Sequence, residues 1–501
     1  MIAPLNPLPQ RRFFDLSRRS ARGGMVQLGA QGVQLGLTVA SGTALARLIA
    51  PGDFGLVGMA ATLTSLATVL RDFGMPTATV QRAGIEDRDV TALFWLGLRL
   101  NLALAVCMML VGPAVAEFYN EPRVTEIVVF LALSGLIAGA GGQHEALLVR
   151  QMRFVALRTI DLSSLAIGMI AGVALAAAGA GYRALIVQTS VIAAARTLGL
   201  WRTCRWRPGP QGSGASDRLA SLASFGWYHT GAKLLRHLSQ NVDQIVVGSL
   251  FGARQLGFYD SAYRWSISSS QQIYTPLQHV AVSGLSRLQH DPEAFRVAAG
   301  RGLLPLFSAI IPALALLALE AHPVILLLLG PQWEPSVPLF RMLCLGAMGS
   351  ALAKAVNWLY LAEGRTKQQM RWGFVTLPVF VVAVLIGAIR GPLGVATGFA
   401  VAHWLLVTPE VVYCLRNSHL PVRDYAFTAG RPLVASAVAV AALLAIAGVP
   451  HDTNIVRLAL TSATFLALYA ASWFVLPGGR RAAHQLVRLL RAIPTSRSES
   501  R

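Results

Sequence analysis

Long apolar segments alternate with short polar connections along almost the whole chain. A helix needs about 20 apolar residues to cross about 30 Å of hydrocarbon. Fourteen segments reach this length: 24–50, 54–81, 89–118, 124–149, 155–179, 182–203, 219–250, 255–286, 296–319, 335–362, 368–389, 393–416, 427–448 and 454–476. Turn sequences such as Pro51-Gly52-Asp53 and Gly391-Pro392 separate neighbouring segments. The pattern predicts an all-α polytopic membrane protein of about fourteen transmembrane helices.

Composition agrees with a membrane protein and argues against several other classes. Hydrophobic residues make up 54% of the 501 residues and charged residues 13%, whereas soluble domains carry roughly 25% charged residues. The net charge of +20 does not indicate a nucleic-acid partner, because the basic residues lie mostly in short connections between apolar segments. The cysteines show neither metal-ligand spacing nor a disulfide pattern. They are Cys107, Cys204, Cys344 and Cys414. We therefore expect no metal and no cofactor.

Lysine and arginine predict the orientation in the membrane. The N-terminus and every second connection are rich in arginine, as in Arg202, Arg205 and Arg207, whereas the other connections hold about one basic residue each. Cytoplasmic connections carry this excess. The alternation predicts an even number of spans with both termini in the cytoplasm. The predicted cytoplasmic ends are a basic N-terminus, 1–23, and a basic tail, 477–501, with an amphipathic helix on the inner leaflet.

A stretch rich in proline, glycine and serine, 204–217, is the clearest linker. It divides the chain into an N-lobe of six spans, 24–203, and a C-lobe of six spans, 218–420, followed by a helix pair, 421–476. The lobes carry similar polar stripes on their first spans, at a constant offset of 202 residues (243 minus 41). The stripes are Gln27, Gln31, Gln34, Thr38 and Ser41, and His229, Lys233, Arg236, Gln240 and Asp243. Two similar six-span lobes predict pseudo-symmetry about an axis along the membrane normal.

Positively charged side chains inside the spans indicate a binding site. A charge in lipid is costly and usually serves function, and an arginine fork suits phosphate oxygens. The candidate cavity residues are Arg99, Lys233, Arg236, Gln240, Arg264 and Lys354. The alternative is local pairing or snorkelling, for example of Arg264 with Asp260 one turn away. We favour a wet cationic cavity for the set as a whole.

Carboxylates inside the spans are candidates for ion coupling. Asp161 and Asp243 are the better ones, although structural pairing is the favoured interpretation of each. Glu145 is expected to lie near a cytoplasmic end, either as a helix cap or as a partner of Arg150. Glu363 is expected to be a helix cap or a partner of Arg365 near a cytoplasmic end. His144 and His403 are expected to be core histidines with satisfied hydrogen bonds.

Several phrases resemble one known family. They are ARLIAPGDFGLVGMA (46–60), ALFWLGLRLNLALA (92–105), QNVDQIVVGSLFGARQLGFYDSAYR (240–264) and LLGPQWEPSVPLFRML (328–343). From about residue 20 to 420 the chain is similar to the bacterial polysaccharide and O-antigen flippases of the multidrug/oligosaccharidyl-lipid/polysaccharide transporter superfamily. None of these phrases is a catalytic motif.

The resemblance implies two six-helix lobes, alternating access and a cargo of undecaprenyl-diphosphate-linked oligosaccharide, moved across the bacterial inner membrane. It also suggests membrane lipids and a polysaccharide polymerase as partners. Two other functions stay open. One is export of a drug or a peptidoglycan precursor by the same fold, although an exporter of cationic drugs should have a more acidic cavity. The other is a membrane-embedded glycosyltransferase or polymerase. The short outer connections and the lack of a nucleophile, metal or nucleotide motif favour a carrier over an enzyme.

Overall fold

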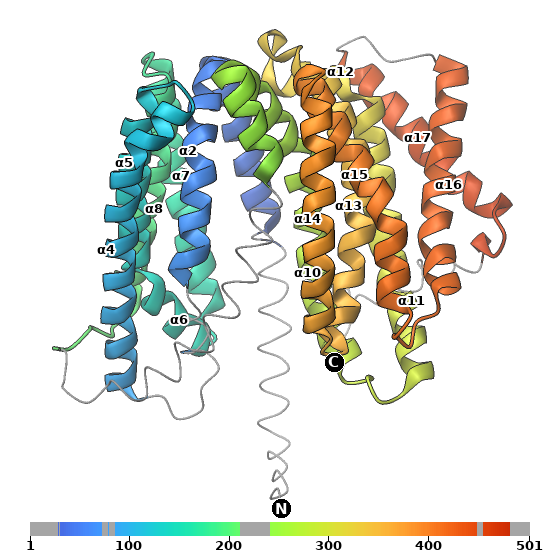
Figure 1. The fold of residues 1–501 in the computed structure, drawn as a ribbon, viewed down its shortest axis with the longest axis horizontal. Helices are drawn as coiled ribbons and strands as arrows, with labels where there is room; N and C mark the ends of the chain where they lie inside the picture. Colours follow the sequence, from blue (N-terminus) through green and yellow to red (C-terminus); the bar gives the residue numbers. More distant parts are fainter. Residues whose placement is uncertain are drawn as a thin grey trace, which may run out of the picture. The chain divides into compact units, whose positions relative to one another are not determined.

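The computed structural model describes residues 31–72, 86–210, 241–447 and 454–480, together with residues 29 and 79. Within these ranges all regular structure is helical and no strand occurs. The chain forms two compact units, Met1–Leu238 and Ser239–Arg501, which are described separately (Figure 1). The predicted all-α fold is confirmed.

The first long helix among the described residues of unit 1 covers residues 31–48. Six further described helices follow: α2 (Pro51–Asp72), α4 (Asp87–Phe118), α5 (Arg123–Gly139), α6 (Gly142–Arg150), α7 (Phe154–Ala177) and α8 (Tyr182–Thr203). The main packing pairs are α7 with α8 and α4 with α5, and α5 also packs on α2 and α8. Close contact of α7 with α8 depends on Gly168 and Gly172, whose missing Cβ atoms would lie 2.2 Å from Ile192 Cγ1 and 2.8 Å from Gln188 Cβ.

In unit 2 the described residues start with a helical stretch, 241–263, in which Gly252 adopts a positive φ of 77°. The predicted boundary between the spans 219–250 and 255–286 falls at this glycine. Then follow η1 (Arg264–Ser268), α10 (Ser269–Ser286), α11 (Pro292–Leu319), α12 (Ala321–Leu329), η2 (Pro331–Trp333), α13 (Ser336–Ala362), α14 (Thr366–Ala388), α15 (Gly391–Leu415), α16 (Val422–Ala447) and α17 (Ile455–Val475).

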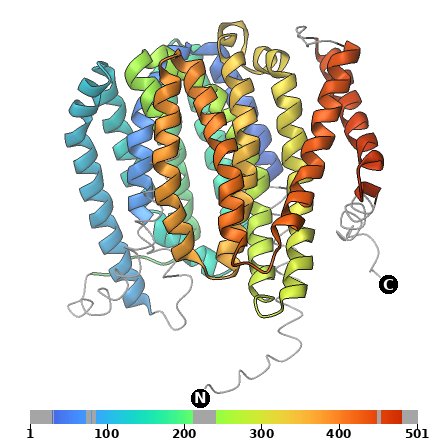
Figure 2. The same ribbon diagram turned by 45° about the vertical axis from the view of Figure 1, so that its right-hand side comes forward.

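The core of unit 2 surrounds α13, which packs on α10, α11 and α15. In an apolar stretch of 18 residues, 72% of the residues of α13 are buried, against 11% of those of α14. Most of the surface of α14 therefore faces outward. The last two helices, α16 and α17, pack on each other, and α16 also packs on α11 (Figure 2).

Ten helical segments in the described ranges are long and apolar enough to cross a membrane. They include α4, the α5–α6 stretch, α7, α8, α11 and each helix from α13 to α17. The protein is therefore a multi-pass membrane protein. The count of fourteen stays a prediction, since the predicted span 219–250 lies largely outside the described residues. The predicted domain limits also stay predictions, because the linker 204–217 is described only as far as residue 210.

One turn geometry occurs in both units. Between α6 and α7, Met152 has a φ of 55°, and between α13 and α14, Gly364 has a φ of 70°. The next residue is in each case an arginine at the N-cap, Arg153 or Arg365. Arg153 Nη1 donates to the carbonyl of Thr203, the last residue of α8, at 3.2 Å, and Arg365 Nη1 donates to the Cys414 carbonyl near the end of α15 at 2.9 Å. This repeated contact supports the duplication inferred from the polar stripes.

Candidate functional site

An ion-pair network links α6, α7 and α8 in unit 1. The Arg196 guanidinium binds both carboxylate oxygens of Glu145, at 2.8 and 3.0 Å, and donates from Nε to Asp161 at 2.8 Å. Arg158 contacts the other oxygen of Asp161 at 3.4 Å. These side chains are partly buried, and two positive charges balance two negative ones. The network therefore joins three helices at low net charge.

This network settles two of the carboxylate predictions. Structural pairing of Asp161 is confirmed. The predicted pairing of Glu145 with Arg150 is wrong, because Arg150 Nη1 instead donates to the Thr79 carbonyl at 2.9 Å and Glu145 binds Arg196. Sequence reasoning missed Arg196. The signal that could have found it is depth, since Asp161 lies six residues from the predicted cytoplasmic end at 155 and Arg196 lies seven residues from the predicted end at 203.

Arg99 lies on the exposed side of α4. With Trp95, Leu98 and Leu102 it lines a shallow hollow of about 330 Å³. Asn101 is buried instead, where its amide donates to the Gly97 carbonyl at 2.7 Å and packs on Gly139. The structure thus presents Arg99 at the surface of unit 1, and its predicted role in binding cargo stays a prediction.

Two of the predicted charges in unit 2 are engaged locally. Arg264 is paired with Asp260 at 2.9 Å and stays 61% exposed, as the local-pairing alternative predicts. Asp243 is fully buried, and its Oδ2 accepts a 2.7 Å hydrogen bond from the Tyr259 hydroxyl, whereas its Oδ1 has no hydrogen-bond partner in the structure.

Lys354 is half-buried on α13 and forms no ion pair with any described residue. Its carbonyl accepts a hydrogen bond from Tyr274 at 2.6 Å. The other predicted cavity residues, Lys233, Arg236 and Gln240, lie outside the described residues. The structure therefore tests neither their positions nor the predicted cavity.

Of the remaining structural predictions, those for Glu363 and His403 are confirmed and that for His144 is only partly met. Glu363 binds Arg365 and is confirmed as its partner. His403 is confirmed as a satisfied histidine, since its Nδ1 lies 2.9 Å from the Phe399 carbonyl. His144 is buried as predicted, but neither ring nitrogen has a hydrogen-bond partner. Instead its ring stacks on Trp201, with centroids 4.4 Å apart.

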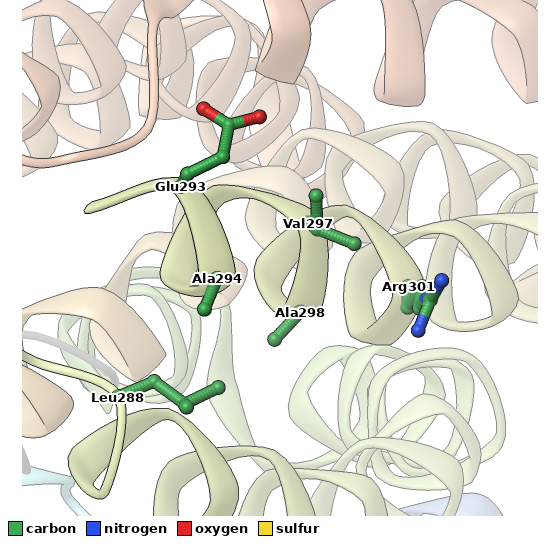
Figure 3. A pocket seen from close by; sticks show the side chains of 6 residues that line it. All are labelled: Leu288, Glu293, Ala294, Val297, Ala298 and Arg301. Carbon is green, nitrogen blue, oxygen red and sulfur yellow. The ribbon is translucent and has the colours of Figure 1, made fainter. Parts of the chain in front are cut away.

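A second hollow, of about 480 Å³, opens beside the first turns of α11 (Figure 3). Ala294 and Ala298 of α11 face Leu288 across it, and Glu293, Val297 and Arg301 complete its lining. It holds none of the predicted site residues. No cluster of three or more potential metal ligands occurs in the described part of the chain, and all four cysteines are unpaired.

A family model described as "Polysaccharide biosynthesis protein" matches residues 44–338, which is more than half of the chain. The chain belongs to this family. The match extends from the first described helix of unit 1 to the start of α13, so it covers parts of both units.

Named relatives agree with this membership. The chain is 26% identical over 368 residues to the lipopolysaccharide biosynthesis protein WzxC of Escherichia coli (strain K12), covering 73% of this chain and 74% of that one. It is 24% identical to the succinoglycan biosynthesis transport protein ExoT of Rhizobium meliloti (strain 1021), covering 78% and 79%. The family resemblance read from the sequence is confirmed.

Solved structures show the same fold. The lipid II flippase MurJ in an inward closed conformation matches with a TM-score of 0.72 at 12% identity, over 90% of this chain and 97% of that one. An inward-facing multidrug resistance MATE family transporter of the MOP superfamily matches with a TM-score of 0.62 at 14% identity, over 81% and 99%.

Proposed function

We propose that the protein is a flippase that moves undecaprenyl-diphosphate-linked oligosaccharide repeat units from the inner to the outer leaflet of the bacterial inner membrane, with both termini in the cytoplasm. The observation that carries the proposal is the family match, extended by relatives named for the synthesis of different polysaccharides. These relatives match about three quarters of the chain. The fold shared with a lipid II flippase supports movement of a lipid-linked cargo rather than catalysis.

The cargo's diphosphate is the group that the intramembrane cations suit. Arg99 offers a surface-exposed guanidinium on unit 1, and Lys354 carries a positive charge inside a span with no described counterion. A diphosphate bound near such groups gains charge-assisted hydrogen bonds that a neutral cavity cannot supply. Arg264, Lys233, Arg236 and Gln240 complete the proposed set. Alternating access would expose these groups to each side of the membrane in turn.

An ion gradient is the proposed energy source. Asp161 already has two cationic partners, which favours a structural role for it. Asp243 keeps one carboxylate oxygen without a hydrogen-bond partner, so it is the better candidate for binding a coupling ion. Normal transport by Asp243→Asn under imposed proton and sodium gradients would contradict this role.

One rival cargo has a specific observation in its favour. The resemblance to the lipid II flippase over 90% of this chain suits a peptidoglycan precursor as well. The relatives named for lipopolysaccharide and succinoglycan synthesis favour a polysaccharide repeat unit. A polysaccharide polymerase is the proposed protein partner, since it would receive the translocated units.

The test is complementation of a strain that lacks this protein. We expect lipid-linked oligosaccharide to accumulate on the inner leaflet of the deletion strain, and the wild-type chain to restore polymer production. Failure of the wild-type chain to do so would contradict the proposed function. Accumulation of lipid II instead would favour the rival cargo.

The cationic site is tested separately in the same strain. We expect Arg99→Ala, Arg236→Ala and Arg264→Ala each to lower polymer production, whereas Arg202→Ala, at an exposed position at the end of α8, should leave it unchanged. Full activity of all three alanine variants at matched expression would remove the diphosphate site and leave the flippase function standing.

A further inference from the structure

One side of α4 carries an aromatic group, a cation and an apolar section in that order. The five residues of this side, called the α4 stripe, are Trp95, Arg99, Leu102, Val106 and Leu110. At 3.6 residues per turn they fall within about 80° of the helix circumference. Trp95 is half-buried, and the other four are exposed. The stripe therefore forms one continuous surface along the helix.

The stripe is hollowed at the end nearest Asp87, where α4 begins. The hollow of about 330 Å³ is lined by Trp95, Leu98, Arg99 and Leu102. Ligand sites commonly have volumes of about 300–1,000 Å³. The hollow is therefore large enough to hold part of a ligand, with an indole ring and a guanidinium group in its wall.

The Trp95 indole is held in place by two contacts. Its Nε1 donates to the Gly209 carbonyl at 3.0 Å. Its ring meets the Phe94 ring edge to face, with centroids 5.5 Å apart and planes at 81°. Because the one polar atom of the ring is already bound, the surface that Trp95 offers to the hollow is apolar. A ring that is fixed beforehand loses little side-chain entropy when a ligand packs on it.

Arg99 lies one helical turn beyond Trp95, about 6 Å further from Asp87. A guanidinium group binds phosphate oxygens with two parallel hydrogen bonds. Beyond Arg99 the apolar section from Leu102 to Leu110 follows, and the next charged residue of α4 is Glu117. The stripe thus passes from an aromatic ring through a phosphate-binding group to a purely apolar surface.

This order matches the order of groups in a lipid-linked sugar of the inner leaflet. The connection before α4 contains Arg82 and Arg88, which predicts that the Asp87 end lies at the cytoplasmic side. In that leaflet the sugar lies toward the cytoplasm, the diphosphate lies next to it, and the prenyl chain extends into the bilayer. A phospholipid shares the phosphate and the chains but has no sugar ring to pack on an indole. Trp95 therefore favours the cargo over a phospholipid.

We propose that the Trp95 indole is a platform for the first sugar of the cargo, next to the diphosphate that Arg99 binds. The assignment rests on the proposed function and adds a residue that recognises the sugar. Packing of a sugar's C–H face on a flat ring requires no hydrogen bond to a particular hydroxyl group. Trp95 would therefore accept different sugars and still distinguish a glycosylated lipid diphosphate from a bare one.

The test compares the affinities of the full-length protein, purified in detergent, for two probes. They are undecaprenyl diphosphate and undecaprenyl-diphosphate-linked glucose, each measured by microscale thermophoresis. We expect the wild-type protein to bind the glycosylated probe about three- to tenfold more tightly, the range that packing on an aromatic ring supplies. Trp95→Ala should abolish this preference and keep the affinity for undecaprenyl diphosphate. Arg99→Gln should weaken both probes by about tenfold or more and keep the preference.

Two further variants separate the platform from a structural role of Trp95. Trp95→Phe keeps an aromatic face but loses the hydrogen bond to Gly209, and it should retain most of the preference. The matched control is Trp404→Ala on α15, because Trp404 is also exposed and also donates from Nε1 to a carbonyl, that of Leu345, at 3.0 Å. It has no charged residue three or four positions away. Both affinities should be unchanged in Trp404→Ala.

Three results would overturn the platform. They are equal affinity of the wild-type protein for the two probes, an unchanged preference in Trp95→Ala, and loss of the preference in Trp95→Phe as in Trp95→Ala. Displacement of the glycosylated probe by an equal concentration of phosphatidylglycerol would also overturn it, because the hollow would then hold ordinary phospholipid. Failure of the wild-type chain to complement the deletion strain would count against the flippase function alone, because these binding measurements require no transport.

Discussion

Arg196 shows how a single residue accommodates charge inside unit 1. Its guanidinium binds two carboxylates on two other helices. The opposite charges on the three helices therefore largely neutralise one another. A charge left alone in a membrane span costs several kcal/mol, and removing one partner of such a network leaves the others uncompensated. Arg196 is therefore expected to matter more for stability than any exposed arginine of α8.

We predict that Arg196→Ala lowers the free energy of unfolding by about 1–3 kcal/mol, because Glu145 and Asp161 lose their shared cation. Thermal unfolding in detergent measures the effect, with Arg202→Ala as the matched control on the same helix. A triple variant, Arg196→Met with Glu145→Gln and Asp161→Asn, should recover part of the loss. An Arg196→Ala protein as stable as Arg202→Ala would show that the network contributes nothing.

Sequence reasoning succeeded for Asp161 and failed for Glu145 for one physical reason. That a carboxylate in a span needs a partner follows from the cost of charge in lipid. Which partner it finds depends on how the helices pack side by side. Gly168 and Gly172 bring α7 onto α8, and the charges of three helices then meet at one depth.

Packing between elements also depends on small residues in unit 2. On α14 and α15 a Cβ atom added to Gly387 would lie 2.2 Å from the Gly394 carbonyl oxygen, and one added to Gly398 would lie 2.4 Å from that of Ala383. These contacts involve backbone atoms, which cannot turn aside as a side chain can. Glycines permit this close approach, a device common between membrane helices.

We predict that Gly398→Ala destabilises unit 2 by about 2–4 kcal/mol, because the new methyl group forces α14 and α15 apart. The control is Gly373→Ala on α14, where an added Cβ meets no atom within 4 Å. It should leave stability unchanged or raise it by up to about 1 kcal/mol. Thermal unfolding of the two purified variants decides the matter. Equal stability of the two would show that the helices can separate without cost.

Glu320 links the C-terminal helices to the rest of unit 2. It lies between α11 and α12 and is 1% exposed, and Thr461 and Arg457 of α17 are its neighbours. Burial raises the pKa of Glu320, and the hydrogen bond from Thr461 and the charge of Arg457 oppose that rise in part. The sequence placed this carboxylate in an outer connection, but its burial depends on the docking of α17, which no local pattern reveals.

The raised pKa of Glu320 predicts a pH dependence of stability. The folded state binds the proton more tightly than the unfolded state, so stability increases as pH falls from the raised pKa toward the ordinary value near 4.5. It decreases again as pH rises through the folded pKa. Glu320→Gln should remove this part of the slope of unfolding temperature against pH, and Glu334→Gln should keep it. An unchanged slope in Glu320→Gln would contradict the prediction.

At the scale of the whole molecule, the duplication predicted from two polar stripes has an independent counterpart in structure. The arginine contacts made by Arg153 and Arg365 occur at corresponding turns of the two units. The two turns differ in one residue: Arg365 has Glu363 as an ion-pair partner, whereas the equivalent position before Met152 is the uncharged Gln151.

The pattern of apolar segments predicted most helix positions, because length and hydropathy determine where a chain can cross a bilayer. It could not predict the breaks within spans, such as the turn between α5 and α6 or the residue between α11 and α12, which depend on tertiary packing.

Orientation in the membrane is the remaining global prediction, and it is testable with the protein's own cysteines. Cys107 is exposed and the other three cysteines are buried. A Cys107→Ser variant therefore has no exposed native thiol. Glu334 and Arg416 are both exposed, and the helices α13, α14 and α15 separate them. Because three crossings change sides, a membrane-impermeant maleimide should label Glu334→Cys in intact cells with a permeable outer membrane, and Arg416→Cys only after the inner membrane is disrupted. The reverse pattern would invert the orientation inferred from arginine-rich connections. Labelling of both positions from one side would mean that one of the three helices does not cross the membrane.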